Sequence, residues 1–93
     1  MIIEWLPRSI NNRDKLIRDI ATHNVAAAVR CLDEIVIQVD DLAAHPNMGR
    51  KGRWSGTCEL AISHTEFIVV YRVRPKLQRV EIMRVLHARQ QYP

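Results

Sequence analysis

A long amphipathic segment constrains the fold of this chain more than any other feature. From residue 25 to residue 42, apolar side chains recur at steps of three and four, which is the spacing of one face of an α-helix. They are Val25, Ala28, Val29, Leu32, Ile35, Val36, Val39 and Leu42. The pattern predicts a helix of about five turns that has Asn24 as its N-cap and ends before His45-Pro46.

Two shorter elements are expected before this helix. Residues 2–5 are apolar enough for a short strand, which Pro7 would end because proline has no backbone N–H to donate. Ser9 or Asn11 is the expected N-cap of a helix that runs to about His23. Because almost nothing separates this helix from the next, the two are expected to form an antiparallel helical hairpin with a very tight connection.

After residue 56 the apolar pattern changes to a period of two. Over residues 57–62, 67–74 and 80–83 every second side chain is apolar, which predicts three strands. The segments between them are short enough for hairpins, so the strands are expected to form an antiparallel meander. The expected fold class is therefore α+β: an N-terminal strand, a helical hairpin and a three-stranded antiparallel meander, in a single domain over residues 1–93.

The register of the meander follows from matching apolar faces, because a slip of one residue would exchange the two faces. The expected pairs are Cys58 with Tyr71, Leu60 with Val69, Ile62 with Phe67, Tyr71 with Ile82, and Val73 with Val80. This face is expected to lie under the helices. The opposite face should remain open, half apolar and half charged, with Arg72 across from Glu81; its residues are Glu59, Ile68, Val70, Arg72, Arg74, Arg79, Glu81 and Met83. Arg84 breaks the alternation, so either a β-bulge shifts the register or Arg84 lies at a rim.

Charge is distributed unevenly along the chain. Up to Ala44 there are five basic and seven acidic residues, for a net charge of −2. From His45 onward there are nine basic and three acidic residues, for a net charge of +6. A basic half on a small protein favours an anionic partner, which is either nucleic acid or an acidic protein segment. Composition does not distinguish the two.

Several function classes receive no support from the sequence. No segment approaches the roughly 18 consecutive apolar residues of a membrane span, and the first residues lack a signal-peptide pattern, so a cytoplasmic protein without a membrane partner is expected. Cys31 and Cys58 are expected to be reduced thiols, with Cys58 directed into the core. His23, His45 and His64 lack the spacing of metal ligands, and neither a metal nor a cofactor is expected.

The basic loop from Gly49 to Trp54 is the first candidate functional segment. Arg50, Lys51 and Arg53 lie on it between glycines. Such a loop can surround phosphate or carboxylate groups, and Trp54 could stack on a base. Alternatively, the loop is a solvated connector with Trp54 anchored inward.

The second candidate segment is the C-terminal tail. His87, Arg89 and Tyr92 lie in it, and Arg84 comes just before it. A histidine beside arginines and a tyrosine can perform general acid–base catalysis on RNA, with the arginines stabilising the charged transition state. The alternative is that His87 only ends the last strand and that the tail folds back.

These segments together carry a family resemblance. HPNMGRKGRWSGTCEL at residues 45–60, YRV at 71–73 and VEIMRVLHARQQYP at 80–93, preceded by a strand and a helical hairpin, resemble the RelE/ParE superfamily of toxins from bacterial type II toxin–antitoxin modules. The ParE-like branch is the most similar, and the resemblance spans nearly the whole chain. It implies a compact toxin that arrests growth, takes part in plasmid stabilisation, and is held in a hetero-oligomer by a cognate antitoxin that occupies a groove of the sheet.

Two cellular targets divide this superfamily. ParE-like members resemble non-enzymatic inhibitors of DNA gyrase, and RelE-like members resemble ribosome-dependent endoribonucleases, or mRNA interferases. The ribonuclease residues here would be Arg72, Arg84, His87 and Tyr92. The residues expected to bind a target or the antitoxin are Arg50, Lys51, Arg53, Trp54, Glu59, Arg72, Arg89 and Tyr92.

One departure from the family favours the non-enzymatic alternative. Where many relatives read GTRE, residues 56–59 of this chain read GTCE, so Cys58 replaces an arginine that could contact phosphate. The same departure is compatible with a weakened toxin. A third hypothesis, from another class, is a simple nucleic-acid-binding module whose affinity falls steeply with salt.

Overall fold

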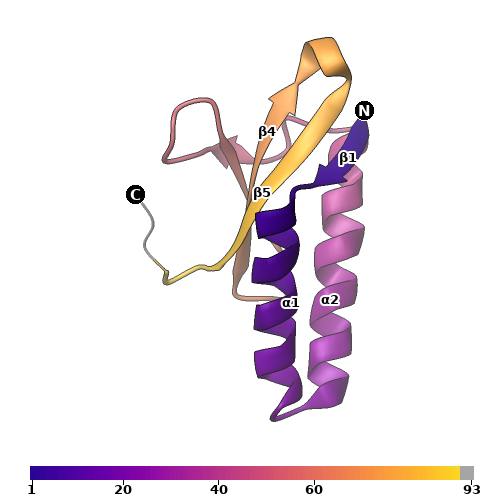
Figure 1. The fold of residues 1–93 in the computed structure, drawn as a ribbon, viewed down its shortest axis with the longest axis vertical. Coiled ribbons are helices and arrows are strands. Elements are labelled where there is room, and N and C mark those ends of the chain that lie inside the picture. Colours follow the sequence, from indigo (N-terminus) through magenta and orange to yellow (C-terminus); the bar gives the residue numbers. More distant parts are fainter. Residues whose placement is uncertain (91–93) are drawn as a thin grey trace.

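The structure, a computed structural model, describes residues 1–90 and places two helices on one side of a five-stranded sheet (Figure 1). The elements are β1 (Ile2–Trp5), α1 (Pro7–Ala21), α2 (Val25–Asp40), β2 (Arg50–Lys51), β3 (Cys58–Ala61), β4 (Phe67–Arg74) and β5 (Arg79–His87), with short 3₁₀ turns at Asp41–Ala43 and Pro75–Leu77. The strand order is β1-β5-β4-β3-β2, with β1 parallel to β5 and the other pairs antiparallel. The predicted α+β class is confirmed.

The start of α1 differs from the prediction. The helix begins at Pro7, and the N-cap is Leu6 rather than Ser9 or Asn11. Proline suits the first turn because its fixed φ is helical and its missing N–H would have had no partner there. Ser9 is instead buried within that turn, where its hydroxyl donates to the carbonyl oxygen of Leu6 at 2.6 Å.

The start of α2 agrees with the prediction. The side-chain oxygen of Asn24 accepts a hydrogen bond from the backbone N–H of Ala27 at 3.0 Å, which satisfies one of the free donors of the first turn. The helix ends at Asp40 and is followed by the 3₁₀ turn, slightly before the predicted boundary at His45-Pro46. Within residues 1–90, neither helix combines the length and the apolar character that a membrane span requires.

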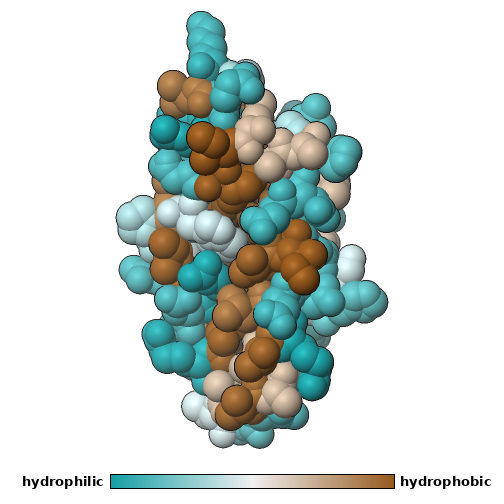
Figure 2. All heavy atoms as spheres, turned by 90° about the vertical axis from the view of Figure 1, so that its right-hand side faces the viewer, coloured by the Kyte–Doolittle hydropathy of each residue, from teal (hydrophilic) through white to brown (hydrophobic). Residues whose placement is uncertain are grey.

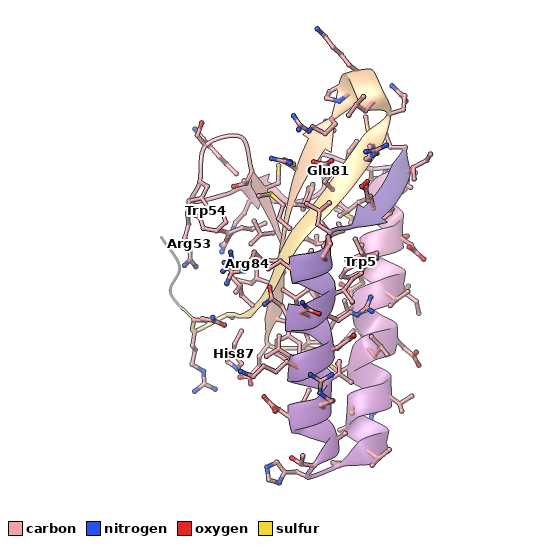
Figure 3. All side chains as sticks on the ribbon, viewed as in Figure 1. Trp5, Arg53, Trp54, Glu81, Arg84 and His87 are labelled. Carbon is pink, nitrogen blue, oxygen red and sulfur yellow. The ribbon has the colours of Figure 1, made fainter. Side chains whose placement is uncertain are left out.

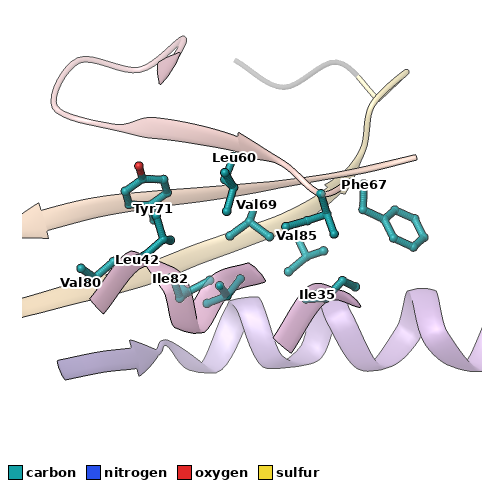
Figure 4. Packing of buried hydrophobic residues seen from close by; sticks show 11 residues of the cluster. Ile35, Leu42, Leu60, Phe67, Val69, Tyr71, Val80, Ile82 and Val85 are labelled. Atoms are coloured by element: carbon teal, nitrogen blue, oxygen red, sulfur yellow. The ribbon is translucent and has the colours of Figure 1, made fainter. Parts of the chain in front are cut away.

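The main core lies between α2 and the sheet (Figure 4). Ile35, Val39 and Leu42 pack against apolar side chains of β3, β4 and β5. Four of the predicted strand pairs are confirmed: Cys58 with Tyr71, Leu60 with Val69, Tyr71 with Ile82, and Val73 with Val80. The N–H of Ile62 donates to the carbonyl oxygen of Phe67 at 3.0 Å, which agrees with the fifth pair.

A β-bulge in β5 resolves the irregularity at Arg84. Val70 pairs with Arg84 but Tyr71 pairs with Ile82, so Met83 has no partner on β4. The extra residue reverses the alternation of β5 beyond this point. Arg84 therefore lies on the side away from the helices.

The sequence did not reveal β2. Arg50 pairs with Glu59 and Lys51 with Cys58, which adds a fifth strand to the edge of the expected platform. A two-residue strand shows no alternation, so nothing in the sequence marked this part of the basic loop as a strand. The loop is thus part of the sheet at its start.

The open face of the sheet was predicted to expose apolar residues, and this prediction was wrong. Ile68, Val70 and Leu86 are buried, and Trp54 packs against Val70 and Leu86. Trp54 is therefore anchored inward, as one of the two alternatives for the loop proposed. The exposed part of this face is left to charged side chains.

Tyr71 joins the basic loop to the core. Its ring is fully buried, and its hydroxyl donates to the carbonyl oxygen of Pro46 at 2.8 Å and accepts from the N–H of Gly49 at 3.0 Å. Burial raises the pKa of this hydroxyl, so it stays protonated and able to donate. A side chain at position 49 would place its Cβ 2.7 Å from the Tyr71 oxygen, so only glycine fits.

We expect Tyr71→Phe to lower the free energy of unfolding by about 1–3 kcal/mol, because the Pro46 carbonyl and the Gly49 N–H both lose a buried partner. Urea unfolding monitored by circular dichroism measures this change. Gly49→Ala should be at least as destabilising, whereas Gly56→Ala, where a new Cβ meets no atom within 4 Å, should cost only the strain of its φ of 78°. Equal stability of the wild type and Tyr71→Phe would contradict this role.

Candidate functional site: an arginine-rich face

The side of the sheet away from the helices carries a group of arginines, which we call the arginine face (Figure 3). Strand alternation on β4 and β5, the bulge before Arg84 and the pairing of β2 bring them to the same side. Its members are Arg50, Arg53, Arg72, Arg74, Arg79 and Arg84. Two carboxylates lie among them and are nearly inaccessible, Glu59 at 2% and Glu81 at 6% exposure.

Glu59 organises one end of the arginine face. Its Oε1 lies 3.1 Å from Nη2 of Arg50, and its Oε2 lies 3.5 Å from Nε of Arg53. The backbone N–H of Arg53 also donates to Oε2 at 3.3 Å. The buried carboxylate therefore holds both the side chain and the backbone of the loop, while the Arg50 side chain remains 69% exposed.

Glu81 organises the other end. Its Oε1 accepts from Nε of Arg72 at 2.5 Å and from Nε of Arg74 at 3.2 Å, and Arg79 Nη1 lies 3.9 Å from its Oε2. Arg79 also pairs with Glu4 on β1 at 3.1 Å. The hydrogen bond from Arg72 holds the pKa of Glu81 below its usual value, so this carboxylate stays ionised at neutral pH.

Arg84 lies between the two ends and is supported by α1. Its Nε donates to Oδ1 of Asn12 at 3.1 Å. Figure 3 shows the Arg84 side chain pointing from β5 to the side on which Arg53 and Trp54 lie. Nothing in the local sequence pattern around Asn12 indicates contact with a strand residue 72 positions away.

His87 belongs to a separate cluster. Val85 and Phe67 are in the main core, and the His87 ring packs edge-on against Phe67 with ring centroids 6.0 Å apart, so His87 lies on the helix side of β5. Its Nε2 is 3.2 Å from Oε2 of Glu66, and Arg89 Nη2 is 3.1 Å from Oε1 of the same carboxylate. These contacts, first that of Arg89, lower the pKa of Glu66.

The contacts of the His87 ring favour one tautomer of the neutral imidazole. The backbone N–H of Arg89 donates a hydrogen bond to Nδ1 at 3.2 Å, so Nδ1 is an acceptor. In the neutral ring the hydrogen is therefore on Nε2, and Nε2–H donates a hydrogen bond to Glu66. Glu66 was not among the predicted functional residues. Its position in the hairpin between β3 and β4 gave no indication of contact with the end of β5.

The structure separates the predicted ribonuclease residues. Arg72 and Arg84 lie on the arginine face, whereas His87 lies on the helix side of the sheet. Tyr92 lies outside the described residues. Of these residues, the structure thus brings together the two arginines without the imidazole.

The predicted binding residues are also divided. Arg50, Arg53 and Arg72 lie on the arginine face, and Trp54 packs onto the sheet beside them. Lys51 pairs with Cys58, whose side chain packs on the core side, and Arg89 joins the Glu66 cluster. Glu59 is buried and pairs with Arg50 and Arg53.

Three further residues belong to the site although they were not predicted as site residues. The sequence pattern placed Arg74, Arg79 and Glu81 on this face of the sheet, but it gave no indication that they bind a partner.

The described residues offer little for metal or thiol chemistry. Across residues 1–90, no cluster of three His, Cys, Asp or Glu side chains is arranged around a possible metal ion. Cys31 and Cys58 are not joined in a disulfide. Burial, with a smaller contribution from Glu34, raises the pKa of the Cys31 thiol, which disfavours the reactive thiolate. What suits the arginine face to electrostatic binding of an anionic group is its own partly exposed guanidinium groups.

Comparisons with solved structures find similar folds in chains of two toxin–antitoxin systems. A chain of the chromosomal ParDE toxin–antitoxin system of Pseudomonas aeruginosa superposes with a TM-score of 0.82 at 21% identity, covering 94% of this chain and 95% of that one. A chain of the RelBE2 toxin–antitoxin complex of Mycobacterium tuberculosis gives a TM-score of 0.59 at 21% identity, covering 92% and 88%. At this level of identity the likeness concerns the fold.

Sequence comparison identifies the family. Residues 3–92 match the family described as the ParE toxin of the type II toxin–antitoxin system parDE. The candidate toxin Y4kP of Sinorhizobium fredii is 36% identical over 91 residues, which cover 98% of this chain and 92% of that protein. The chain therefore belongs to the ParE toxin family, within the RelE/ParE superfamily that its sequence resembles.

The stability difference between the wild type and Glu81→Gln should depend on pH in a defined way. We expect Glu81→Gln to lower the free energy of unfolding at pH 7 by about 1 kcal/mol, since the half-exposed arginines lose a charged acceptor. Because the pKa of Glu81 is lowered in the folded state, this contribution is complete above the ordinary glutamate value of about 4.3 and is lost as the pH falls through the lower folded value.

The measurement is urea unfolding of the wild type and Glu81→Gln between about pH 7 and pH 3. The stability difference should stay constant down to about pH 5 and then shrink. A difference that grows as the pH falls would show that the ion pairs do not stabilise the fold.

Proposed function

We propose that this ParE-family chain arrests bacterial growth from the cytoplasm by binding an essential protein, DNA gyrase, without catalysing a reaction. We further propose that a cognate antitoxin neutralises it by occupying the arginine face. The two parts are independent, because the first concerns the target and the second concerns the inhibitor.

The observation that carries the first part is the absence of a suitable proton-transfer group on the arginine face, within residues 1–90. The carboxylates there, Glu59 and Glu81, are bound by arginines, and the imidazole of His87 lies on the other side of the sheet. General acid–base catalysis requires a group that gains or loses a proton beside the reacting atoms. A buried carboxylate with a lowered pKa, such as Glu81, does not readily do so.

The second part rests on charge and preorganisation. Glu59 and Glu81 fix four of the arginines, Arg50, Arg53, Arg72 and Arg74, before any partner arrives, so a partner does not have to order these long side chains. The acidic groups of a peptide would find several guanidinium groups on one side of the sheet. The structures with similar folds belong to toxin–antitoxin systems, which supports an antitoxin as the partner.

The antitoxin proposal is tested with the product of the neighbouring reading frame. In Arg50→Gln/Arg74→Gln, Arg53 and Arg72 remain to pair with Glu59 and Glu81, so the fold should be kept. We expect this variant to bind the antitoxin at least about tenfold more weakly by calorimetry and to escape rescue on co-expression. Arg8→Gln/Arg18→Gln, which removes two exposed charges from α1, is the matched control and should bind as the wild type does. Equal affinities of the two variants for the antitoxin would refute the proposal that the antitoxin binds the arginine face.

The target proposal is tested with purified gyrase and plasmid. The wild type and His87→Ala should both inhibit supercoiling and both arrest growth, because the proposed mechanism needs no imidazole. Circular dichroism must first show that His87→Ala is folded, since His87 packs against Phe67. Undiminished supercoiling at high toxin excess would exclude gyrase as the target.

Ribosome-dependent cleavage of mRNA remains the alternative function, because Arg72 and Arg84 share one face and arginines can stabilise a phosphorane. It makes the opposite prediction for the same variant. If it holds, His87→Ala abolishes growth arrest, and primer extension on ribosome-bound mRNA shows new 5′ ends with the wild type alone.

A further inference from the structure

The arginine face has a regular arrangement along the strands. The pairing of β2, β3 and β5 with their neighbours places its arginines at three successive levels of β4: Arg50 and Arg84 at the first, Arg72 at the second, and Arg74 with Arg79 at the third. Successive levels on one face of a strand are two residues apart, which is about 6.8 Å at roughly 3.4 Å per residue. The face therefore carries a ladder of cations that follows β4.

This spacing suits the backbone of a nucleic acid. Adjacent phosphates on one strand of DNA are a similar distance apart through space, so a strand that follows β4 would bring one phosphate to each level. The forked N–H groups of a guanidinium match the oxygens of a phosphate. An acidic peptide needs an acidic residue at every second position to match the ladder, whereas every nucleotide supplies a negative charge.

The arginine face stays positive after its own ion pairs are counted. Its six arginines face three carboxylates, those of Glu4, Glu59 and Glu81, so three positive charges remain within residues 1–90. The five arginine side chains that pair with these carboxylates are between 37% and 69% exposed. Each guanidinium has five N–H donors, so it can bind a phosphate and keep its carboxylate partner.

The helix side of the molecule has a different character. Figure 2 views the side on which α2 lies and shows a band of hydrophobic side chains along it. Among its 16 residues, α2 has one basic residue, Arg30, and three acidic residues, Asp33, Glu34 and Asp40. A polyanion is therefore attracted to the arginine face and repelled by α2, and this asymmetry orients the protein as it approaches.

We propose that the arginine face binds the phosphate backbone of double-stranded DNA, along the direction of β4 and without regard to base sequence. A duplex presents its phosphates outward and keeps its bases stacked inside, which suits a face made of cations. Because the antitoxin is proposed to occupy the same face, DNA and the antitoxin are expected to compete for it. DNA binding by the toxin alone does not depend on whether the proposed target and antitoxin are correct.

Fluorescence anisotropy of a labelled short duplex, titrated with the toxin alone, tests the proposal. Three contacted phosphates predict that the logarithm of the association constant falls with the logarithm of the salt concentration with a slope of about −2.7. Affinity should thus fall about fortyfold between about 50 and 200 mM salt. Two duplexes of unrelated sequence should bind within about twofold of each other. No binding at about 50 mM salt, or a slope shallower than about −1, overturns the proposal.

Matched variants locate the binding. Arg50→Gln/Arg74→Gln removes one cation from the first level and one from the third, and it should weaken binding at least about tenfold at low salt and make the slope shallower by about 1 to 2. Arg18→Gln/Arg30→Gln removes two exposed cations from the helices and is the control with the same net charge. It should keep the slope of the wild type. Equal losses in the two variants would mean that net charge rather than the arginine face carries the binding, and would overturn the proposal.

Two further results distinguish the other possible partners of the face. Binding of single-stranded RNA more tightly than of the duplex would assign the arginine face to RNA and overturn the proposal. If no duplex binds while the antitoxin does, and Arg50→Gln/Arg74→Gln weakens the antitoxin complex, the face serves a protein alone: the DNA proposal fails and the antitoxin proposal stands. Circular dichroism confirms the fold of each variant before these measurements.

Discussion

The unpaired residue in β5 determines what each side of the sheet carries. With Met83 out of register, Ile82 and Val85 both enter the core while Arg84 turns to the opposite side. Unbroken alternation would place Arg84 on the same side as Ile82. Burying an unpaired guanidinium in an apolar core would lower the free energy of unfolding by roughly several kcal/mol. The presence of Arg84 on the arginine face and the separation of His87 from that face both follow from this one residue.

Two buried carboxylates make it possible for many cations to share one side of a small sheet. Guanidinium groups repel one another, and without Glu59 and Glu81 they would spread into solvent and lose their common orientation. Each carboxylate instead fixes several of them at once while it remains inaccessible. The arginine face is therefore cationic and its side chains are already ordered. The carboxylates that order them are too deeply buried to contact a binding partner.

The sequence predicted what depends on local pattern. Asn24 marks the start of α2, and matching faces gave the register of the meander because both rest on neighbouring residues. What it missed depends on contacts across the fold. Arg84 with Asn12 spans 72 residues and His87 with Glu66 spans 21, and no periodicity records such contacts. Alternation showed an irregularity at Arg84, but a bulge and a rim position break the pattern in the same way.

The parallel pairing of β1 with β5 joins the first strand of the chain to the last one that the ribosome makes among the described elements. During synthesis, Ile2–Trp5 has no strand partner until Arg79–His87 has emerged, so β1 cannot join the sheet until α1, α2 and β2 to β4 have all been made. A nascent chain thus lacks both its closed sheet and the Glu81 end of the arginine face. The arginine face is therefore a late product of folding, whereas the helical hairpin, whose two helices are adjacent in the sequence, can form early.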